Sequence, residues 1–514
     1  METPKIIVKN SCIQVYNYEF GSCPKLENAF RIYDVTTHSC YYLGLYYNQE
    51  KKILYLPRGI DIWYVEKILE TKAYVERDMY NPFDKYRDIK IKYLPKDDVQ
   101  KEALRFTLGK GEYTSTATKS QLSVNLNTGK GKTYISVATF SFTGIKTIII
   151  TYATNWLEQW EDRILEYTNL TKKDICFITV SGVLYRLMNS SEDRISQYKV
   201  FLVTHSTIKS YGDTHGWEQV GELFKHLKIG IKIFDEAHMN FSNMLMIDFF
   251  TNVYKTYYLT ATAMRSDPRE NEIYQMCMKN ILSIELFNPE IDPHSDYCAI
   301  LYNSYPSAQI ISACKNQYGL DRNRYINYAV NSEEFFKLSV VLIDMITNIL
   351  DRGKPNSKCL IYIGTNQAIN VFVQEITKVF PEMESEIGIY TSIVSPEEKE
   401  KAKEKKFIIT TTKSASACVD IPNLKVVLLL NEPFASAVLA RQSLGRLRDN
   451  NTIYFEVVDT GFKQCKRFYS KKKPVFAKYA QDCQQTEISK TELEARYQKV
   501  MEKLEKRFYP IRFF

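Results

Sequence analysis

The hydrophobic positions of this chain fall into short runs that alternate with longer amphipathic stretches. Runs rich in β-branched and aromatic residues, separated by stretches of helical periodicity, are typical of parallel strands buried on both faces of a sheet. The pattern therefore predicts an α/β protein with two parallel-sheet domains in tandem. The runs are KTIIITY, YKVFLVT, IGIKIFD and TYYLTAT in the first series, and KCLIYIG, KFIITTT, KVVLLLN and TIYFEVV in the second.

The ends of the chain follow other patterns. YYLGLYYNQEKKILYLPRGID reads as two strands joined by a polar turn, and IWYVEKILETKAY reads as a short helix. Prolines and acids in FNPEIDPHSDY interrupt the α/β pattern near residue 292, and the chain becomes basic and then helical after residue 461. We therefore expect an N-terminal α+β accessory domain, two α/β domains and a basic helical extension, over residues 1–92, 93–291, 292–461 and 462–514.

Composition narrows the class of protein. The 514 residues are 45% hydrophobic and 25% charged, with 68 Lys+Arg against 60 Asp+Glu, as in ordinary globular proteins. Eleven cysteines without a C-x-x-C pair argue against a disulfide framework or a zinc site, and for a reducing compartment. No run approaches the ~18 apolar residues needed to span a bilayer, and no signal peptide is evident. We expect a soluble cytoplasmic protein with no membrane partner and no zinc.

The stretch NLNTGKGKT has the chemistry of a phosphate-binding loop. A strand, LSVNL, precedes it and a helix, YISVATFSF, follows it, so backbone N–H groups can converge on phosphate oxygens at a helix N-terminus. Lysine supplies charge to the terminal phosphates and threonine supplies a hydroxyl for Mg²⁺. Leu126 stands where the first glycine of the usual pattern belongs, and alone the stretch could also be a basic turn. The candidate residues are Thr128, Gly129, Lys130, Gly131, Lys132 and Thr133.

A pair of carboxylates, Asp235 and Glu236, follows a buried strand about 100 residues after this loop. Asp235 can hold Mg²⁺ together with Thr133, and Glu236 can orient the attacking water, which is the minimum chemistry for hydrolysing a γ-phosphate. Alone, such a pair could simply be acids at a helix N-terminus. The combination with the upstream loop predicts an ATP and Mg²⁺ site.

These two stretches, GKGKT and DEAH, resemble motifs I and II of the superfamily 2 helicases, in the DEAH-type spelling. Further similar motifs follow in the family's order: LPKDDVQKEAL, ATNWLEQW, FLVTHSTI, LTATAMR, TKSASACVDIP and QSLGRLRD. The chain departs from the family at Val99, where tyrosine is usual, and at Cys418, where glycine is usual. The layout is also similar to that of the phage UvsW-type helicases, and this resemblance implies that the accessory domain, residues 1–92, binds DNA.

The resemblance implies two tandem RecA-like motor domains and assigns roles to residues in the matching motifs. Gln100 and Asp420 are expected at the nucleotide, and Thr260 and Thr262 in coupling hydrolysis to motion. Four residues are expected at the nucleic-acid backbone: Thr207, Thr391, Thr412 and Ser416. Three residues are expected at the γ-phosphate: Gln442, Arg446 and Arg448.

The spacing of the two arginines leaves open which one is the arginine finger. Arg446 keeps the family's Gly-Arg pair, whereas the second arginine, Arg448, comes one residue early. On one helix the two would point to different faces, so only one could readily reach the γ-phosphate. We expect Arg448 to be the finger.

The sequence thus favours an ATP-dependent DNA helicase or translocase acting on single-stranded, forked or branched DNA, in replication, repair or recombination and of phage or viral type. An RNA helicase and a binding module with a vestigial ATPase fold are the alternatives. The basic segment KQCKRFYSKKKPVFAK interleaves seven Lys/Arg with aromatic residues, which suits a nucleic-acid platform built from charge and stacking. A solvated basic tail would have the same composition.

Overall fold

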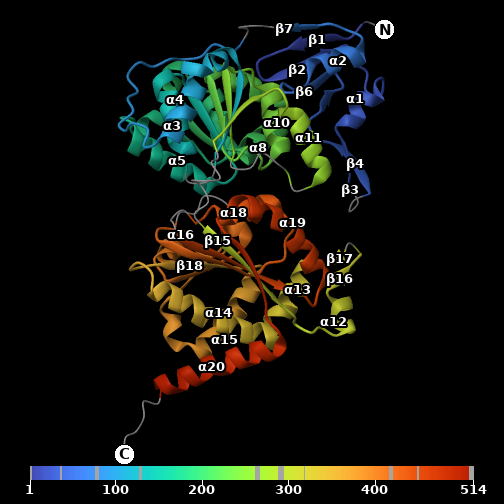
Figure 1. The fold of residues 1–514 in the computed structure, drawn as a ribbon. Helices are drawn as coiled ribbons and strands as arrows, with labels where there is room; N and C mark the ends of the chain where they lie inside the picture. Colours follow the sequence, from blue (N-terminus) through green and yellow to red (C-terminus); the bar gives the residue numbers. More distant parts are fainter. Residues whose placement is uncertain are drawn as a thin grey trace, which may run out of the picture. The chain divides into compact units, whose positions relative to one another are not determined.

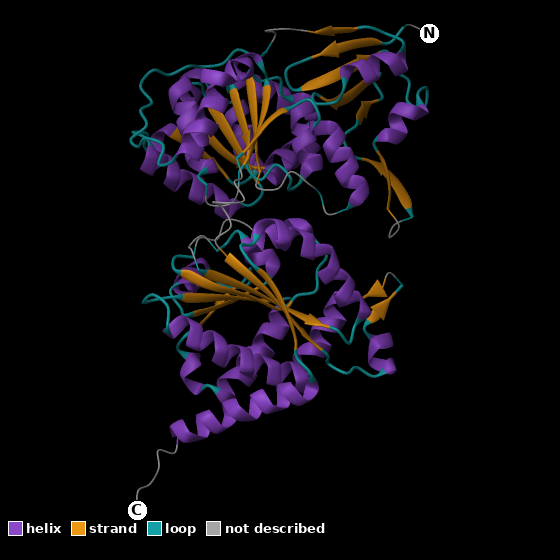
Figure 2. Ribbon diagram, in the orientation of Figure 1, coloured by secondary structure: helices purple, strands orange, loops and turns teal. Residues whose placement is uncertain are grey.

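The computed structural model describes residues 3–34, 38–75, 80–126, 130–260, 265, 267–286, 295–317, 319–415, 421–447 and 451–508. It divides into two compact units, Met1–Phe287 and Asn288–Phe514. Each unit contains a seven-stranded parallel sheet with helices on both faces (Figures 1 and 2). These sheets, with a small N-terminal β-rich sheet beside the first, confirm the predicted fold class of tandem RecA-like domains.

The sheet of the first unit has the strand order β10-β11-β9-β12-β13-β8-β14. Its strands are β8 (Gln121–Asn125), β9 (Thr147–Thr151), β10 (Ile175–Ile178), β11 (Val200–Thr204), β12 (Ile231–Phe234), β13 (Lys255–Thr260) and β14 (Leu282–Glu285). Its helices are α3 (Asp98–Leu108), α4 (Lys132–Thr143), α5 (Thr154–Tyr167), α6 (Ser181–Met188), α7 (Glu192–Ser196), α8 (His205–His215), α9 (Trp217–His226), α10 (Phe241–Phe250) and α11 (Pro268–Met278), with short 3₁₀ helices at Gly111–Thr118 and Lys172–Asp174.

The sheet of the second unit has the order β19-β20-β18-β21-β22-β15-β23. Its strands are β15 (Ser295–Tyr302), β18 (Lys358–Ile363), β19 (Ile387–Tyr390), β20 (Phe407–Thr410), β21 (Leu424–Asn431), β22 (Thr452–Asp459) and β23 (Cys483–Glu487), and β16 (Lys315–Asn316) and β17 (Gly319–Leu320) form a separate ribbon. Its helices are α12 (Ala308–Ala313), α13 (Arg322–Val330), α14 (Glu333–Asp351), α15 (Asn366–Val379), α16 (Pro396–Lys403), α17 (Thr412–Ala415), α18 (Ala437–Leu444), α19 (Lys463–Tyr479) and α20 (Lys490–Phe508), with a short 3₁₀ helix at Pro381–Glu384.

The continuous apolar runs of the central strands follow from burial on both sheet faces. Along β21, Val426 and Leu428 enter the core on one face of the sheet, while Val427 and Leu429 enter the core on the other. A strand alternates its side chains between faces, so only a strand covered on both sides needs an unbroken hydrophobic run. This is why the periodicity of the sequence identified these strands.

The N-terminal sheet shares its hydrophobic core with the first unit. Its strand order is β5-β6-β2-β1-β7, and one continuous cluster of buried residues joins it to α10. Tyr55 stacks on Phe250 with ring centroids 5.1 Å apart, and the Cys12 thiol donates to the Phe249 carbonyl at 3.5 Å. The strands are β1 (Lys5–Val8), β2 (Cys12–Tyr16), β5 (Tyr46–Asn48), β6 (Ile53–Pro57) and β7 (Ala73–Val75), with helices α1 (Pro24–Ala29) and α2 (Ile62–Leu69) and the ribbon β3 (Arg31–Asp34) and β4 (Ser39–Tyr42).

Residues 80–96 form an extended segment, which we call the strap, along the sheet of the first unit. Lys85 and Ile145 form an antiparallel bridge, as do Ile91 and Thr168. The carboxylate of Asp84 lies 2.7 Å from the ammonium of Lys146, whose side chain is completely buried. Although these residues precede the first α/β run in sequence, their contacts are with the seven-stranded sheet of the first unit and its helices.

The C-terminal residues complete the second sheet. Strand β23 pairs in parallel with β15 at the sheet edge, α19 packs on β22 and α18, and α20 packs on α14 (Figure 1). The basic segment is thus a helix of the folded domain. No helix in the described part of the chain combines the length and apolar character needed to cross a membrane.

Candidate nucleotide-binding site

The start of α4 carries the candidate phosphate loop. Gly131 caps the helix with φ +85°, a left-handed conformation that favours glycine. A Cβ at this position would lie 2.1 Å from Nε2 of Gln100, so the close approach also requires glycine. Gln100 is held on α3, where its Oε1 accepts the Lys96 backbone N–H at 3.0 Å. The structure therefore brings Gln100 to the loop; Lys130 and Thr133 are half-buried there, and Thr128 and Gly129 lie outside the described residues.

Leu126 has a packing role at the position of the missing glycine. Its side chain is fully buried in the core, and its backbone N–H donates to the Thr260 carbonyl at 3.1 Å. Its own carbonyl accepts a hydrogen bond from Nζ of Lys132 at 3.1 Å. The residue that departs from the glycine pattern thus anchors the loop to β13 and helps to position the lysine.

Asp235 follows β12 and is held by an indole. The Trp160 Nε1–H on α5 donates to Oδ2 of Asp235 at 2.8 Å, and both side chains are buried. Burial, and after it the negative charge of Glu236, raises the pKa of Asp235 to about 6. The Trp160 hydrogen bond and the charge of Lys132 act in the opposite direction. A carboxylate with this pKa is ionised at neutral pH but is protonated in mild acid.

Glu236 lies at the centre of a chain of polar contacts. Its Oε1 is 3.4 Å from Nζ of Lys132, and its Oε2 is 3.4 Å from Nδ1 of His238. The same His238 nitrogen is 2.9 Å from the hydroxyl of Thr260. Glu236 adopts φ +48°, a left-handed conformation that is uncommon for residues other than glycine and that concentrates at functional sites. The phosphate-loop lysine is therefore connected through two side chains to Thr260.

These groups meet at the carboxyl ends of neighbouring parallel strands, which is where ligands of open α/β sheets bind. The donor set suits a nucleotide with Mg²⁺: a helix N-terminus and Lys132 for phosphate, and the Thr133 hydroxyl and Asp235 carboxylate for the ion. Among the described residues no group of three or more His, Cys, Asp or Glu could hold a metal. Mg²⁺ is usually held by one or two carboxylates together with substrate phosphates and water, and Asp235 with Thr133 fits that pattern.

The second unit carries the candidate arginine motif just beyond α18. That helix ends at Leu444 with Gly445 as its cap, so Arg446 lies after the helix and the expected helical spacing of the two arginines does not apply. Arg446 is 5% exposed. Burial raises the pKa of the Tyr362 hydroxyl, while the positive charge of Arg446 and its hydrogen bond act to lower that pKa. The backbone of Gln442 is in α18. Its side chain and the whole of Arg448 lie outside the part of the chain that the structure describes.

The three described residues that were expected at nucleic acid are buried. Thr207 is buried and its hydroxyl donates to the Thr179 carbonyl at 3.2 Å. Thr391 and Thr412 are also buried. Three further residues assigned from the resemblance fall outside the described ranges: Thr262, Ser416 and Asp420.

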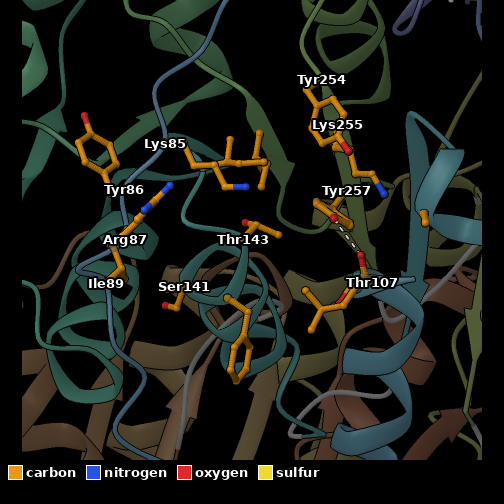
Figure 3. A pocket seen from close by; sticks show the side chains of 15 residues that line it. Lys85, Tyr86, Arg87, Ile89, Thr107, Ser141, Thr143, Tyr254, Lys255 and Tyr257 are labelled. Carbon is orange, nitrogen blue, oxygen red and sulfur yellow. Dashed lines mark hydrogen bonds between the residues drawn. The ribbon is translucent and has the colours of Figure 1, made fainter. Parts of the chain in front are cut away.

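A cavity of about 520 Å³ lies at the other end of α4, beside the strap (Figure 3). Ser141 and Thr143 from the last turn of α4 line it, as does Lys255 at the start of β13. Burial lowers the pKa of Lys255 to about 8, and its ammonium donates to the Thr116 carbonyl at 3.0 Å. This cavity is at the amino ends of the strands, so it is separate from the phosphate loop.

Comparisons with known proteins found one matching family model and several similar folds. Residues 94–265 match the family model described as type III restriction enzyme, res subunit. The DNA-bound ATP-dependent type ISP restriction-modification enzyme LlaBIII is similar in structure, with TM-score 0.52, 13% identity, and coverage of 81% of this chain and 33% of that chain. A single-substitution variant of Dbp5 from S. cerevisiae, bound to RNA and ADP BeF3, has TM-score 0.50 and 16% identity, covering 79% of this chain and 93% of that chain. T4 UvsW has TM-score 0.36 and 14% identity over 94% of this chain and 99% of that chain. The comparison with curated proteins gave no match.

The chain resembles the superfamily 2 helicases. Its phosphate loop, DEAH segment and Thr260 occur in that superfamily's order and meet at one sheet edge of the first unit. Sequence reasoning noted Trp160 only as the end of a motif and missed its hydrogen bond to Asp235. The available signal was a tryptophan on the apolar face of an amphipathic helix, which by itself indicates only core packing.

Proposed function

We propose that this chain is an ATP-dependent DNA helicase or translocase that couples hydrolysis to movement on, or remodelling of, duplex or branched DNA. The observation that carries the proposal is the buried chain of contacts from Lys132 through Glu236 and His238 to Thr260. A purely structural ion pair would not need a histidine and a threonine to connect it to the next strand. In a motor, this connection would transmit the state of the γ-phosphate to the rest of the domain.

Each residue in the site then has a definite task. Lys132 and the N-terminus of α4 bind the phosphates, and Gln100 contacts the base side of the nucleotide. Bound Mg²⁺ would neutralise charge on the β- and γ-phosphates, held by Thr133 and Asp235. Glu236 orients the attacking water and accepts its proton. An arginine of the second unit, for which we propose Arg448, stabilises charge on the transferring phosphoryl group.

DNA is favoured as the substrate by the motifs and by the restriction-enzyme family model matched by residues 94–265. The similar Dbp5 structure contains RNA, so RNA is the alternative substrate. The described residues of the N-terminal region, residues 1–92, form no catalytic constellation, and we propose that this region contributes DNA affinity or choice of junction.

The test is ATP hydrolysis measured with single-stranded DNA, forked DNA and RNA of equal length as stimulants. We expect forked DNA to stimulate turnover most and RNA least. Stimulation by RNA alone would reassign the chain as an RNA helicase. No hydrolysis under any condition would support a vestigial ATPase fold.

A further inference from the structure

Helix α19 is anchored to the second sheet through one face. Phe476 stacks on Tyr297 with ring centroids 3.9 Å apart, and the Tyr469 hydroxyl donates to Oε1 of Gln485 on β23 at 2.9 Å. Lys472 is buried and pairs with Glu456 of β22. Because these contacts run along the helix, its orientation on the domain is fixed.

The opposite face of α19 presents positive charge to solvent. The helix contains no acidic residue, and its exposed cations fall on one stripe at helical spacing. None of them makes an ion pair with a residue that the structure describes. The exposed cations are Lys463, Lys466, Arg467, Lys471, Lys473 and Lys478.

A solvated charged helix normally mixes both signs, as α20 does. There Arg496 lies 2.6 Å from Glu492 on the same helix, and Lys503 lies 2.5 Å from Asp344 of α14. On α19, like charges at helical spacings of three and four residues repel one another and destabilise the helix. An uncompensated stripe on a rigidly held helix therefore points to an external polyanion.

The aromatic side chains of α19 identify the kind of polyanion. Single-strand sites commonly stack bases on exposed aromatic rings. On α19, Tyr469 and Phe476 are buried and Phe468 and Tyr479 are half-buried, the Tyr479 ring lying 4.5 Å from the Arg441 guanidinium, so no fully exposed position of the helix is aromatic. The face thus offers charge without stacking, over a helix of 17 residues that spans about 25 Å.

We propose that the exposed face of α19 binds the phosphate backbone of double-stranded DNA, outside the motif segments of the motor. This inference rests on the proposed function, and it adds a second contact with the substrate, on the duplex. Contacts to phosphates carry no sequence information, so binding should be independent of base sequence. Because α19 packs on α18, which carries Gln442, the duplex would be held next to the arginine motif.

The test replaces four cations of this face by glutamine, at Lys466, Arg467, Lys471 and Lys473. The matched control replaces four cations of α20, at Arg496, Lys499, Lys503 and Lys506, which also removes one arginine and three lysines. Binding to a 30-base-pair duplex and to a 30-nucleotide single strand is measured without ATP between 50 and 200 mM salt. Circular dichroism and thermal midpoints verify folding.

We expect the α19 variant to bind duplex at least ~10-fold more weakly at 100 mM salt, with a salt slope reduced by about 2–4, because each lost phosphate contact removes about 0.9 from the slope. The α20 control should match wild type. Equal slopes for both variants and wild type would overturn the inference, and so would a greater loss on single strand than on duplex. A wild-type chain that binds no DNA would instead overturn the proposed function itself.

Discussion

Nζ of Lys132 lies 3.4 Å from Oε1 of Glu236 at the centre of the site, and replacing each residue should impair the enzyme in a different way. Lys132→Ala removes a charge-assisted contact to phosphate and should lower ATP turnover by on the order of 10³-fold or more. Glu236→Gln should keep nucleotide binding but lose turnover, because the amide cannot accept a proton from water. Single-turnover hydrolysis and nucleotide titration separate the two effects. Near-normal hydrolysis by Lys132→Ala would move the catalytic site elsewhere.

Trp160 lowers the pKa of Asp235 through its hydrogen bond, so its removal should change the response of the enzyme to pH. Trp160→Phe raises that pKa further, and the acid limb of kcat/KM should move to higher pH by about one unit, as expected for a hydrogen bond of 1.5–3 kcal/mol to a charged group. Trp156→Phe, on the same helix and equally buried, is the matched control. A profile for Trp160→Phe that coincides with that of wild type between pH 5 and 8 would contradict this role.

The raised pKa of Asp235 also affects stability. Between pH 3.8 and about 6 the folded chain keeps a proton that the unfolded chain has released, so the free energy of unfolding falls as pH rises through this window. Asp235→Asn abolishes this fall and should make the protein more stable than wild type at pH 7, by up to about 3 kcal/mol. Urea unfolding at pH 4, 5, 6 and 7 measures the difference. A constant gap between the two proteins across the window would argue against a raised pKa.

Replacing Arg446 should lower both stability and activity, whereas replacing Arg448 should lower activity alone. Arg446 is buried against Tyr362, so Arg446→Ala should lower the thermal midpoint as well as activity. Arg448→Ala should cut stimulated turnover by about 10²-fold, as is typical for an arginine finger. Thermal unfolding and DNA-stimulated hydrolysis of both variants decide the assignment. A well-folded but inactive Arg446→Ala beside an active Arg448→Ala would reverse it.

At the scale of elements, the strap should contribute stability through one ion pair whose lysine is completely buried. Asp84→Ala leaves the fully buried ammonium of Lys146 without its carboxylate and should cost about 3 kcal/mol or more. Asp88 is also on the strap and lies 2.6 Å from Lys199, but its side chain is 66% exposed. Asp88→Ala should therefore cost about 1 kcal/mol or less. Denaturant unfolding compares the two, and equal losses would show that the strap does not depend on the buried pair.

The sequence predicted best those elements whose hydrophobic pattern follows from burial alone. Strands β9, β11, β18 and β21 are buried on both faces, so their apolar runs are unambiguous. Strand β23 could not be predicted in this way, because CQQTE is polar and exposed throughout and is a strand only because β15 pairs with it. The strap is similar, since its contacts come from residues far away in sequence.

The residues of the candidate site also divide into those that a local pattern identifies and those whose roles depend on contacts with distant residues. Lys132, Asp235 and Glu236 were found from sequence because their chemistry requires those residue types next to a strand and a helix. The roles of Trp160 and His238 depend on distances between elements, which no local pattern contains. The register of Arg446 also depends on where α18 ends, and the sequence alone permitted a longer helix.

At the scale of the whole molecule, the N-terminal residues complete the core of the first unit, whereas the C-terminal residues complete that of the second. The first unit is closed by its own N-terminal sheet, so residues 1–287 contain its complete core. The second unit is closed by the C-terminal residues, whose packing on α14 and β15 completes its core. The basic helix α19 belongs to this closing segment.

The pairing of β15 with β23 has a consequence for synthesis on the ribosome. Cys298 of β15 is paired with Gln484 of β23, so the second sheet cannot be completed until the ribosome has translated β23, about 180 residues after β15. The first unit can fold while the second is still being made, because domains generally fold as units from the N-terminus. During that interval the backbone groups at the edge of β15 would be free to pair with strands of other molecules. Strand β23, which is polar and is translated later, would then pair with β15 and cover this edge.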